Sequence, residues 1–375
     1  VYTRPVLIRI AGRGRVMLDG AEITGDTVVR TDGEHTVTLI SPNGKNSKTV
    51  VFTVSAGINA YDLGYAGINS VIDDEYNVFI AYMDGVSSLR LYDAADLSRI
   101  RRSLFLPSPV VSCALDGDYL YVFHEGSYTV YDRSKLLTRE EPKLGTYQLS
   151  TGVTDGCVVN GKIYYLSAGR LYSADPMSGG GSMLAEMSGD VDCMFADIGG
   201  VIYMCDSSGA KSHVYTYDTA NGTPGGIDLA LAASGEILAA DGRIFMNGAG
   251  FDSSGNCILL NSEGKPLWTD GRYVIYENSV VRVSDNRVIG VYGKALRSIH
   301  KCSDGAVFLV FEDGTAETFV CSGDGTQAKD HGAAHYLQQI TGESAQTNHY
   351  TYTGWMAAGK RPVSLAVDEA NETAY

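Results

Sequence analysis

The feature that most limits how this chain can fold is a phrase that it repeats about every 40 residues. The phrase is an alternating apolar stretch that ends in a polar turn, and LRLYDAADLSRI at residues 89–100 is its first clear copy. Its tyrosine, or the apolar residue in the same place, recurs at Tyr92, Tyr131, Tyr172, Tyr217, Leu260, Val283 and Val320. A period of this length predicts a repeat architecture, in which each copy forms one small supersecondary unit.

A two-residue turn precedes most copies of the phrase. These turns are Asp116-Gly117, Asn160-Gly161, Gly199-Gly200, Asp241-Gly242, Asp270-Gly271 and Asp304-Gly305. Such pairs tolerate positive φ and join antiparallel strands, and each is followed by an apolar or aromatic stretch such as YLYVF at 119–123. The repeating unit therefore contains four short antiparallel strands, which is typical of a β-propeller blade. We expect an all-β propeller over residues 57–340.

The number of blades follows from the spacing of the phrase. Seven copies predict seven blades, but the steps between them are 39, 41, 45, 43, 23 and 37 residues. The step of 23 is too short for four ordinary strands, so we expect one blade there to lack a strand, and six blades remain an alternative. HYTYTGWMAAG at 349–359 could add a partial eighth. The C-terminal segment, 341–375, contains PVSLAV at 362–367, which could supply a blade-closing strand.

The first 56 residues differ from the rest in charge and in pattern. They hold seven basic and five acidic residues, whereas the whole chain has a net charge of −15. Stretches such as PVLIRI, EHTVTLI and KTVVFTV alternate apolar and polar residues between turn residues. This pattern predicts a separate small antiparallel sandwich over residues 1–56.

This N-terminal segment resembles a known family. The phrases Leu18-Asp19-Gly20, Gly33-Glu34-His35-Thr36-Val37 and Phe52-Thr53-Val54 are similar to those of the short bacterial Ig-like modules of Gram-positive surface proteins. Asp19 stands where such modules often carry Asn, and His35 where an aromatic residue is common. The resemblance covers only residues 1–56, and it implies a bacterial protein that is extracellular or attached to the cell surface.

Composition excludes several partners. The acidic charge argues against nucleic acid and against anionic membrane surfaces, because both require a basic footprint. No apolar run approaches the roughly 18 residues of a membrane-spanning helix, so we expect no membrane insertion within this chain. A monomer is expected.

Cofactor and metal signals are weak. The phrase NSEGKPLW at 261–268 resembles the strand-turn-Trp repeat of PQQ-type propellers, a class of repeats that includes WD-like blades. It occurs once, and the chain has only two Trp, so the resemblance supports a propeller and implies no quinone. His331 and His335 are better explained as one face of a surface helix than as metal ligands. We expect no cofactor, no metal site and no catalytic residue.

The seven cysteines are an odd number and include no Cys-x-x-Cys pair, so no disulfide framework is predicted. Cys113, Cys157, Cys193 and Cys302 lie close to the predicted turns, in the strand expected to line the propeller axis. Only small side chains fit where blades converge. We interpret these cysteines as small buried apolar residues.

Candidate binding residues come from the loops between the second and third strands, which share one face of a propeller. The longest is NGAGFDSSGN at 247–256, where Phe251 could offer an apolar platform and Asp252 an acceptor, unless Phe251 folds back over its blade. The other candidates that could converge near the axis are His124, Arg170, His213, Glu277 and Glu312.

Three functions are compatible with these residues. We favour an extracellular, non-catalytic binding or adhesion protein that uses a propeller face to recognise a carbohydrate, a peptide or another cell-envelope partner. A propeller glycan hydrolase or lyase is an alternative, in which acids such as Glu277 and Glu312 would act as a pair. A structural or sensory ectodomain is the third.

Overall fold

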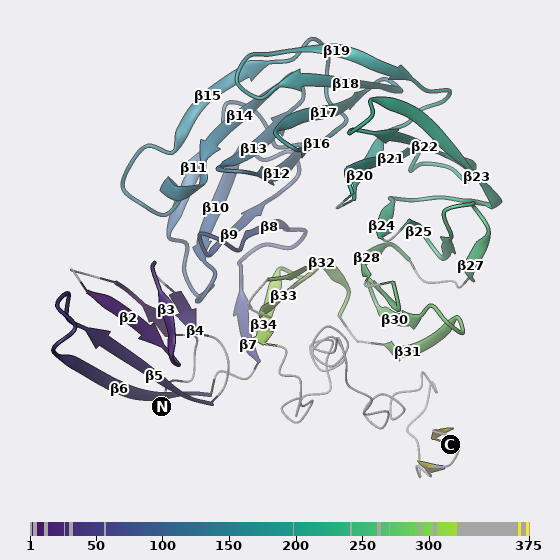
Figure 1. The fold of residues 1–375 in the computed structure, drawn as a ribbon. Helices are drawn as coiled ribbons and strands as arrows, with labels where there is room; N and C mark the ends of the chain where they lie inside the picture. The colour runs from purple at the N-terminus through teal and green to yellow at the C-terminus, as the bar shows by residue number, and fades with distance from the viewer. Residues whose placement is uncertain are drawn as a thin grey trace.

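The fold is built from β-strands, with a single turn of 3₁₀-helix, η1 (Arg133–Lys135), and no α-helix among the described residues. The computed structural model describes residues 2, 6–10, 14–25, 27–29, 33–55, 58–197, 199–240, 242–260, 264–269, 271–291, 294–302, 306–320, 367–368 and 373–374. In this part of the chain, seven four-stranded antiparallel sheets lie between Asn59 and Val320, arranged side by side around an axis (Figure 1).

The first four sheets follow one another along the chain, each with its strands in sequence order. The first contains β8 (Asn69–Asp73), β9 (Val78–Tyr82), β10 (Ser88–Asp93) and β11 (Arg102–Phe105). The second contains β12 (Ser112–Asp116), β13 (Tyr119–His124), β14 (Ser127–Asp132) and β15 (Lys143–Gln148). The third contains β16 (Asp155–Val159), β17 (Lys162–Ser167), β18 (Arg170–Asp175) and β19 (Gly179–Glu186). The fourth contains β20 (Cys193–Ala196), β21 (Val201–Cys205), β22 (Lys211–Asp218) and β23 (Thr223–Ala233).

The fifth and sixth sheets are shorter, and the seventh is composite. The fifth contains β24 (Leu238–Ala240), β25 (Arg243–Met246), β26 (Ala249–Phe251) and β27 (Cys257–Leu260). The sixth contains β28 (Pro266–Thr269), β29 (Tyr273–Tyr276), β30 (Ser279–Arg282) and β31 (Arg287–Val291). The seventh contains β32 (Leu296–Lys301), β33 (Ala306–Phe311), β34 (Thr315–Val320) and, as its outermost strand, β7 (Asn59–Asp62).

The first strand of each sheet lies nearest the axis, where it contacts the first strands of its neighbours (Figure 1). The turn to the second strand is tight: Gly117 has a φ of 52° and Asn160 a φ of 50°, the left-handed conformation that the sequence pattern predicts. Apolar second strands then pack between neighbouring sheets. Phe123 and Tyr165, for example, share one fully buried cluster between the second and third sheets. The core is thus a series of layers between sheets.

Ring closure corrects one expectation. The outermost strand of the seventh sheet is β7, which pairs antiparallel with β34 from Thr315↔Asp62 to Thr318↔Asn59. The chain therefore closes the ring with a strand that precedes the first sheet, and the expected role of 362–367 falls to β7. Residues 362–366 lie outside the described residues, and Val367 belongs to β35 (Val367–Asp368), which pairs with β36 (Thr373–Ala374).

The innermost strands add a second link at this junction. The Ser70 Oγ in β8 lies 2.7 Å from the Ser298 Oγ and 2.8 Å from the His300 Nε2 in β32. Burial lowers the pKa of His300 to about 4, so the imidazole is neutral near pH 7. The first and last sheets therefore meet through hydrogen bonds between uncharged side chains.

The expectation that a blade near residue 260 lacks a strand is wrong. The fifth and sixth sheets each have four strands, and the short step of the repeat is met by strands of three to five residues. A blade can thus have four shortened strands and still keep all four.

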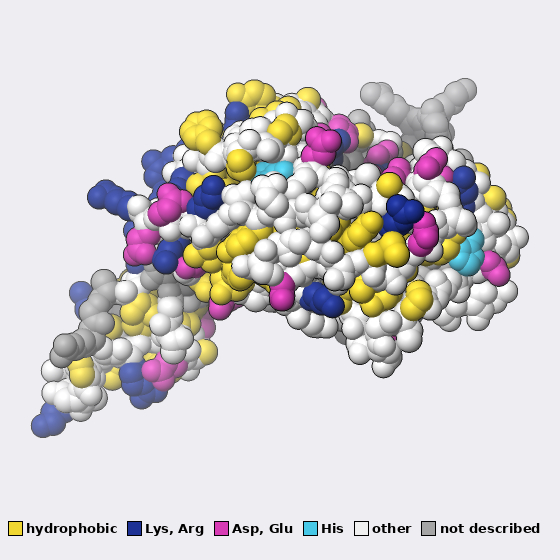
Figure 2. Space-filling model, turned by 90° about the horizontal axis from the view of Figure 1, so that it is seen from above, with side chains coloured by type: hydrophobic (Ala, Val, Ile, Leu, Met, Phe, Trp, Pro, Cys, Tyr) yellow, Lys and Arg dark blue, Asp and Glu magenta, His cyan; other side chains and the backbone are white. Residues whose placement is uncertain are grey.

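The N-terminal segment pairs with itself. β2 (Arg15–Leu18), β3 (Ala21–Ile23), β5 (Gly33–Ile40) and β6 (Ser47–Val54) form one sheet in the order β3-β2-β5-β6, and β1 (Val6–Ile8) pairs with β4 (Thr27–Val29). Among the described residues, none of these strands joins a sheet of the ring. The unit projects beside the ring (Figures 1 and 2). Its Ig-like character and its boundary at residue 56 stay predictions.

The outer edge of the ring is mixed in character. Figure 2 shows this edge over β15 and β19, where apolar side chains are scattered among charged ones. One exposed apolar side chain lies on each of several outermost strands: Phe105, Leu144, Met183, Leu260 and Val291. In the described part of the chain, no helix is long and apolar enough to cross a membrane.

Candidate functional site

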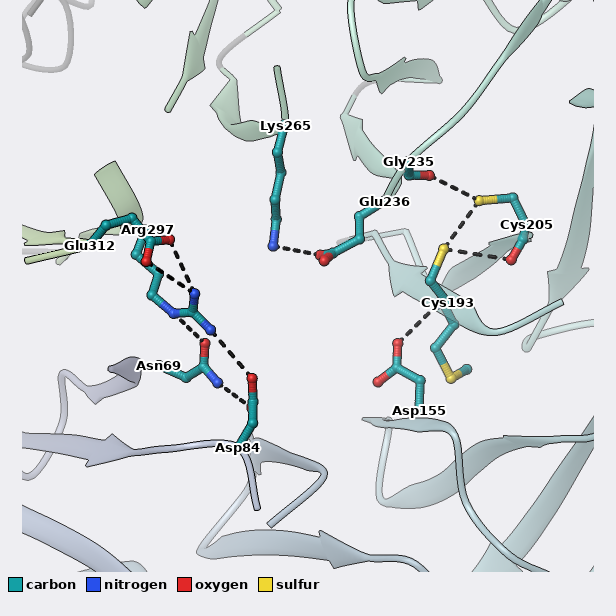
Figure 3. Close-up of polar contacts among 11 residues, drawn as sticks. Asn69, Asp84, Asp155, Cys193, Cys205, Gly235, Glu236, Lys265, Arg297 and Glu312 are labelled. Carbon is teal, nitrogen blue, oxygen red and sulfur yellow. Dashed lines mark hydrogen bonds and ion pairs between the residues drawn. The ribbon is translucent and has the colours of Figure 1, made fainter. Parts of the chain in front are cut away.

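One end of the axis collects charged side chains from six of the seven sheets. The start of a first strand and the end of a second strand lie at the same end of an antiparallel pair, as Asn69 and Tyr82 do in the first sheet. Side chains at these positions therefore surround the axis at one face, which we call the upper face. We define the mouth as Asn69, Asp84, Asp155, Asp192, Glu236, Lys265, Glu277, Arg297 and Glu312 (Figure 3 shows most of them).

Arg297 joins the last sheet to the first across the mouth. Its Nε donates to the Asn69 Oδ1 at 2.9 Å, and its Nη1 donates to the Glu312 Oε1 at 3.1 Å. Its Nη2 lies 3.4 Å from the Asp84 Oδ2, while the Asn69 Nδ2 donates to the Asp84 Oδ1 at 2.6 Å. One guanidinium thus holds two carboxylates and an amide in a fixed arrangement (Figure 3).

The opposite part of the mouth is held by Lys265, whose Nζ lies 2.7 Å from the Glu236 Oε2. Glu277 interacts electrostatically with this pair and also with Glu312 and Arg297. Burial raises the pKa of Glu277, and the neighbouring carboxylates Glu312 and Glu236 raise it further against the effect of the two cations. The mouth therefore carries more negative charge than its cations balance.

Asp155 adds a carboxyl group on the inner strand β16. Its Oδ2 accepts a hydrogen bond from the Met194 backbone N at 3.0 Å, and its Oδ1 accepts one from the Gly156 N at 2.8 Å. Burial raises its pKa to about 6, despite these hydrogen bonds, and the nearby Glu236 and Asp192 add to the rise. Six carboxyl groups thus share the mouth with Lys265 and Arg297.

An apolar notch opens beside the mouth on the same face. It is small, with a cavity volume of about 40 Å³, and lies between the loop before β8 and the loop that joins β9 to β10. Tyr65, Met83 and Val86 form its walls, and the Arg90 guanidinium carbon stacks 3.8 Å from the centre of the Tyr65 ring. Tyr65 and Val86 are exposed. Because Asp84 belongs to the same loop as Met83 and Val86, the notch and the mouth adjoin.

The structure corrects the expected geometry of the 247–256 loop. Phe251 is 0% exposed: it is the last residue of β26 and packs in the apolar cluster between the fourth and fifth sheets. It therefore cannot serve as an exposed platform. The Asp252 carboxylate accepts hydrogen bonds from the Ser254 and Asn256 backbone N atoms, each at 2.9 Å, and so forms the turn itself.

The other candidates have different environments. His124 is buried and bonded to the Pro109 carbonyl and the Thr129 hydroxyl, so its expected place in an open loop is also wrong. Arg170 pairs with Glu186 and His213 with Asp228, both pairs between a third and a fourth strand. Of the predicted residues, Glu277 and Glu312 are the two that belong to the mouth.

Sequence reasoning missed the rest of the mouth. Asn69, Asp155 and Arg297 belong to inner strands, and Glu236 and Lys265 lie just before an inner strand. The signal that could have found them is positional: each is a polar residue at or just before the start of a first strand, at the end opposite to the turn pair.

Comparison with known proteins supports the fold. Neither a protein-family model nor a curated protein matches the chain. The solved structure of U3-55K is similar with a TM-score of 0.55 at 10% identity, over 71% of this chain and 99% of that one. The WD40 repeats of RRP9 match with a TM-score of 0.55 at 10% identity, over 71% and 98% of the two chains.

A third similar structure is that of YCF48 bound to D1 peptide, with a TM-score of 0.50 at 14% identity, covering 71% of this chain and 96% of that one. At such low identity these likenesses bear on the fold alone. The chain is an all-β protein with a β-propeller that is similar in fold to the WD40 repeats of RRP9, which confirms the propeller prediction.

Proposed function

We propose that this protein is an extracellular, non-catalytic binding protein whose upper face recognises a protein segment that carries basic side chains next to an apolar one. The observation that carries the proposal is the apolar notch of Tyr65, Met83 and Val86 directly beside the acidic mouth. Pockets that combine an apolar wall with a few placed polar groups are the usual form of a binding site.

Charge complementarity defines the chemistry of the partner. Burial raises the pKa values of Glu277 and Asp155, two of the mouth's six carboxyl groups, and neighbouring carboxylates raise both pKa values further. A Lys or Arg side chain placed over the mouth would relieve this repulsion. An anionic partner would increase it.

The notch supplies the apolar half of the recognition. Its small volume of about 40 Å³ suits a single apolar side chain rather than a whole cofactor. The fixed Arg297 network beside it keeps the loop of Asp84 in place, so little ordering would be needed on binding. YCF48, which shares the propeller fold, has a solved structure with a peptide bound, and this precedent supports a peptide ligand.

We further infer that the seven sheets are the blades of one seven-bladed ring, that residues 1–56 are a bacterial Ig-like module, and that the protein works as a monomer at the cell surface. These inferences are supported by the seven four-stranded sheets, by the separate pairing of the N-terminal strands and by the sequence resemblance of that segment.

The proposal can be tested with synthetic peptides. Peptides that place Phe or Leu beside Lys and Arg should bind saturably in a fluorescence-polarisation assay, and matched peptides with Glu in place of the cations should not. Binding should weaken as salt is raised, because part of the attraction is electrostatic. Asp84→Asn combined with Glu236→Gln should lower affinity about tenfold, which corresponds to about 1.4 kcal/mol. Met83→Ala should lower it several-fold.

Glu140→Gln provides the matched control, because this exposed acid lies between β14 and β15, at the other face of the ring. It should bind like the wild type. Equal binding of the basic and acidic peptides, or unchanged affinity in both the charge and the Met83 variants, would contradict a peptide site at the mouth.

A glycan hydrolase or lyase is the second candidate, because Glu277 and Glu312 interact electrostatically and burial raises the pKa of Glu277. Glycoside hydrolysis uses a pair of carboxyl groups on either side of the bond that is cleaved. Incubation with a glycan panel separates the candidates: products would appear with the wild type and disappear with Glu277→Gln if this reaction occurs.

A further inference from the structure

Two cysteines of the fourth sheet lie directly opposite each other. Cys193 opens the inner strand β20, Cys205 ends β21, and the two residues are register partners across the antiparallel pair. Their Sγ atoms are 3.1 Å apart, and both residues are buried, at 8% and 1% exposure. This separation is well below that of two sulfur atoms in ordinary contact.

We propose that Cys193 and Cys205 are a redox-active dithiol that a low-molecular-weight disulfide converts into a cross-strand disulfide. The inference goes beyond the proposed binding function and does not depend on it. It rests on register and distance: the sulfur atoms of a disulfide are about 2.05 Å apart. A movement of about 1 Å from the observed separation would therefore complete the bond.

The reaction balances by thiol–disulfide exchange. The Cys193 sulfur, the more exposed of the two, attacks the small disulfide as a thiolate and releases one small thiol. The Cys205 sulfur then displaces the second small thiol from this mixed disulfide and forms the bond to Cys193. The two protein thiols lose two protons and two electrons, and the small disulfide becomes two thiols.

The order of these steps follows from the environment of Cys205. Its hydrogen bond with Cys193, together with burial, raises the pKa of the Cys205 thiol, which disfavours it as the first attacking group. The Cys205 Sγ also donates to the Gly235 carbonyl at 3.4 Å. Oxidation removes this donor beside Glu236, so the disulfide would change a contact of the loop that leads into the mouth (Figure 3).

Cysteines of three other sheets provide internal controls. Cys113 and Cys157 also lie on inner strands, but their register partners are Val122 and Tyr164, so neither has a sulfur opposite. Burial raises the pKa of both thiols. Cys257 is exposed on β27 and should instead accept a mixed disulfide, which reports that the oxidant is active.

The test treats the full chain with excess oxidised glutathione, blocks free thiols in denaturant, and maps the products by mass spectrometry. We expect a peptide pair joined through Cys193 and Cys205, lost on reduction, and absent from Cys193→Ala and Cys205→Ala. Cys113→Ala should still form the bond. Oxidation should raise the melting temperature of the wild type by several degrees, because a short loop becomes closed in the unfolded chain.

A result in which Cys257 is glutathionylated while Cys193 and Cys205 are both recovered as free thiols would overturn the proposal. So would linkage of either cysteine mainly to a third one. These results concern only the dithiol, because the peptide assay can fail or succeed in the reduced protein.

Discussion

The second and fifth sheets have the same strand order but differ greatly in length. β12, β13, β14 and β15 have five or six residues each, whereas β24, β25, β26 and β27 have three or four. Both sheets nevertheless bury large aromatic side chains completely, Phe123 in the second and Phe245 and Phe251 in the fifth. A stable blade therefore requires a packed apolar layer and the correct order of strands more than it requires long strands.

Side-chain packing must contribute a larger share of the stability in the fifth sheet, because this sheet has fewer hydrogen bonds between its strands. Phe251 contacts the apolar cluster that joins the fourth and fifth sheets, in which Val214, Ile244 and Met246 are also buried. A fully buried aromatic side chain contributes several kcal/mol that a short ladder cannot. The fifth sheet is therefore held in the ring mainly by its neighbours.

The largest expected effect tests this comparison directly. Phe251→Ala should lower the free energy of unfolding by about 4 kcal/mol, and Phe123→Ala by about the same amount, because each empties a closed apolar site. Urea denaturation measures both values. Phe105→Ala is the control, since Phe105 is 86% exposed on β11, and it should change stability by less than about 0.5 kcal/mol.

A much smaller loss in Phe251→Ala than in Phe123→Ala would mean that the short sheet is loosely packed, and the comparison would fail. The same variant also tests the prediction from the sequence that Phe251 is an exposed platform for a ligand. The buried position predicts that Phe251→Ala acts through stability, with no selective loss of binding while the protein stays folded.

The contrast between these sheets also shows what the sequence could predict. The turn pairs are local, and residues such as Asn160 and Gly161 need no partner to reveal their positive φ, so the propeller and its repeat were predictable. Phe251 was not. A three-residue strand such as β26 is too short to show the period of two that distinguishes a strand from a loop.

Most of the mouth could not be predicted from the sequence, for a different reason. Asn69 and Arg297 are hydrogen-bonded although 228 residues separate them, and this contact exists only because the ring closes. Glu277 and Glu312 could be predicted because they follow recognisable second strands. Their partners open inner strands, where the repeat has no distinctive residue.

A second prediction concerns the contacts between sheets. The first and second sheets are joined by an ion pair in which the Arg133 Nη2 and Nε lie 2.6 and 2.7 Å from the two carboxylate oxygens of Asp73, which is fully buried. Asp73→Ala should therefore cost about 3 kcal/mol, because it removes the buried carboxylate of the largely buried guanidinium and leaves only the exposed Glu75 and the Gly117 carbonyl as its partners.

The fifth and sixth sheets have a counterpart without a carboxylate, in which the Arg243 Nη1 donates to the Gly271 carbonyl. Arg243→Ala should cost about 1.5 kcal/mol, the lower end of the range for a hydrogen bond that involves a charged group. Urea denaturation measures the free energy of unfolding of Asp73→Ala and Arg243→Ala. If both variants lost the same amount, the buried ion pair between the first and second sheets would be worth no more than the single hydrogen bond between the fifth and sixth.

The smallest expected effect lies on the outer strands. The Arg170 Nη2 in β18 is 2.6 Å from the Glu186 Oε1 in β19, but the two side chains are 43% and 61% exposed. Water and salt screen such a pair, and fixing two long side chains costs entropy that offsets its attraction. Arg170→Ala should therefore melt within experimental error of the wild type, in calorimetric scans at low and at high salt. A drop at low salt as large as that of Asp73→Ala would place the strength of the long sheets in their outer strands, whereas the geometry places it in the buried layers and the junctions between sheets.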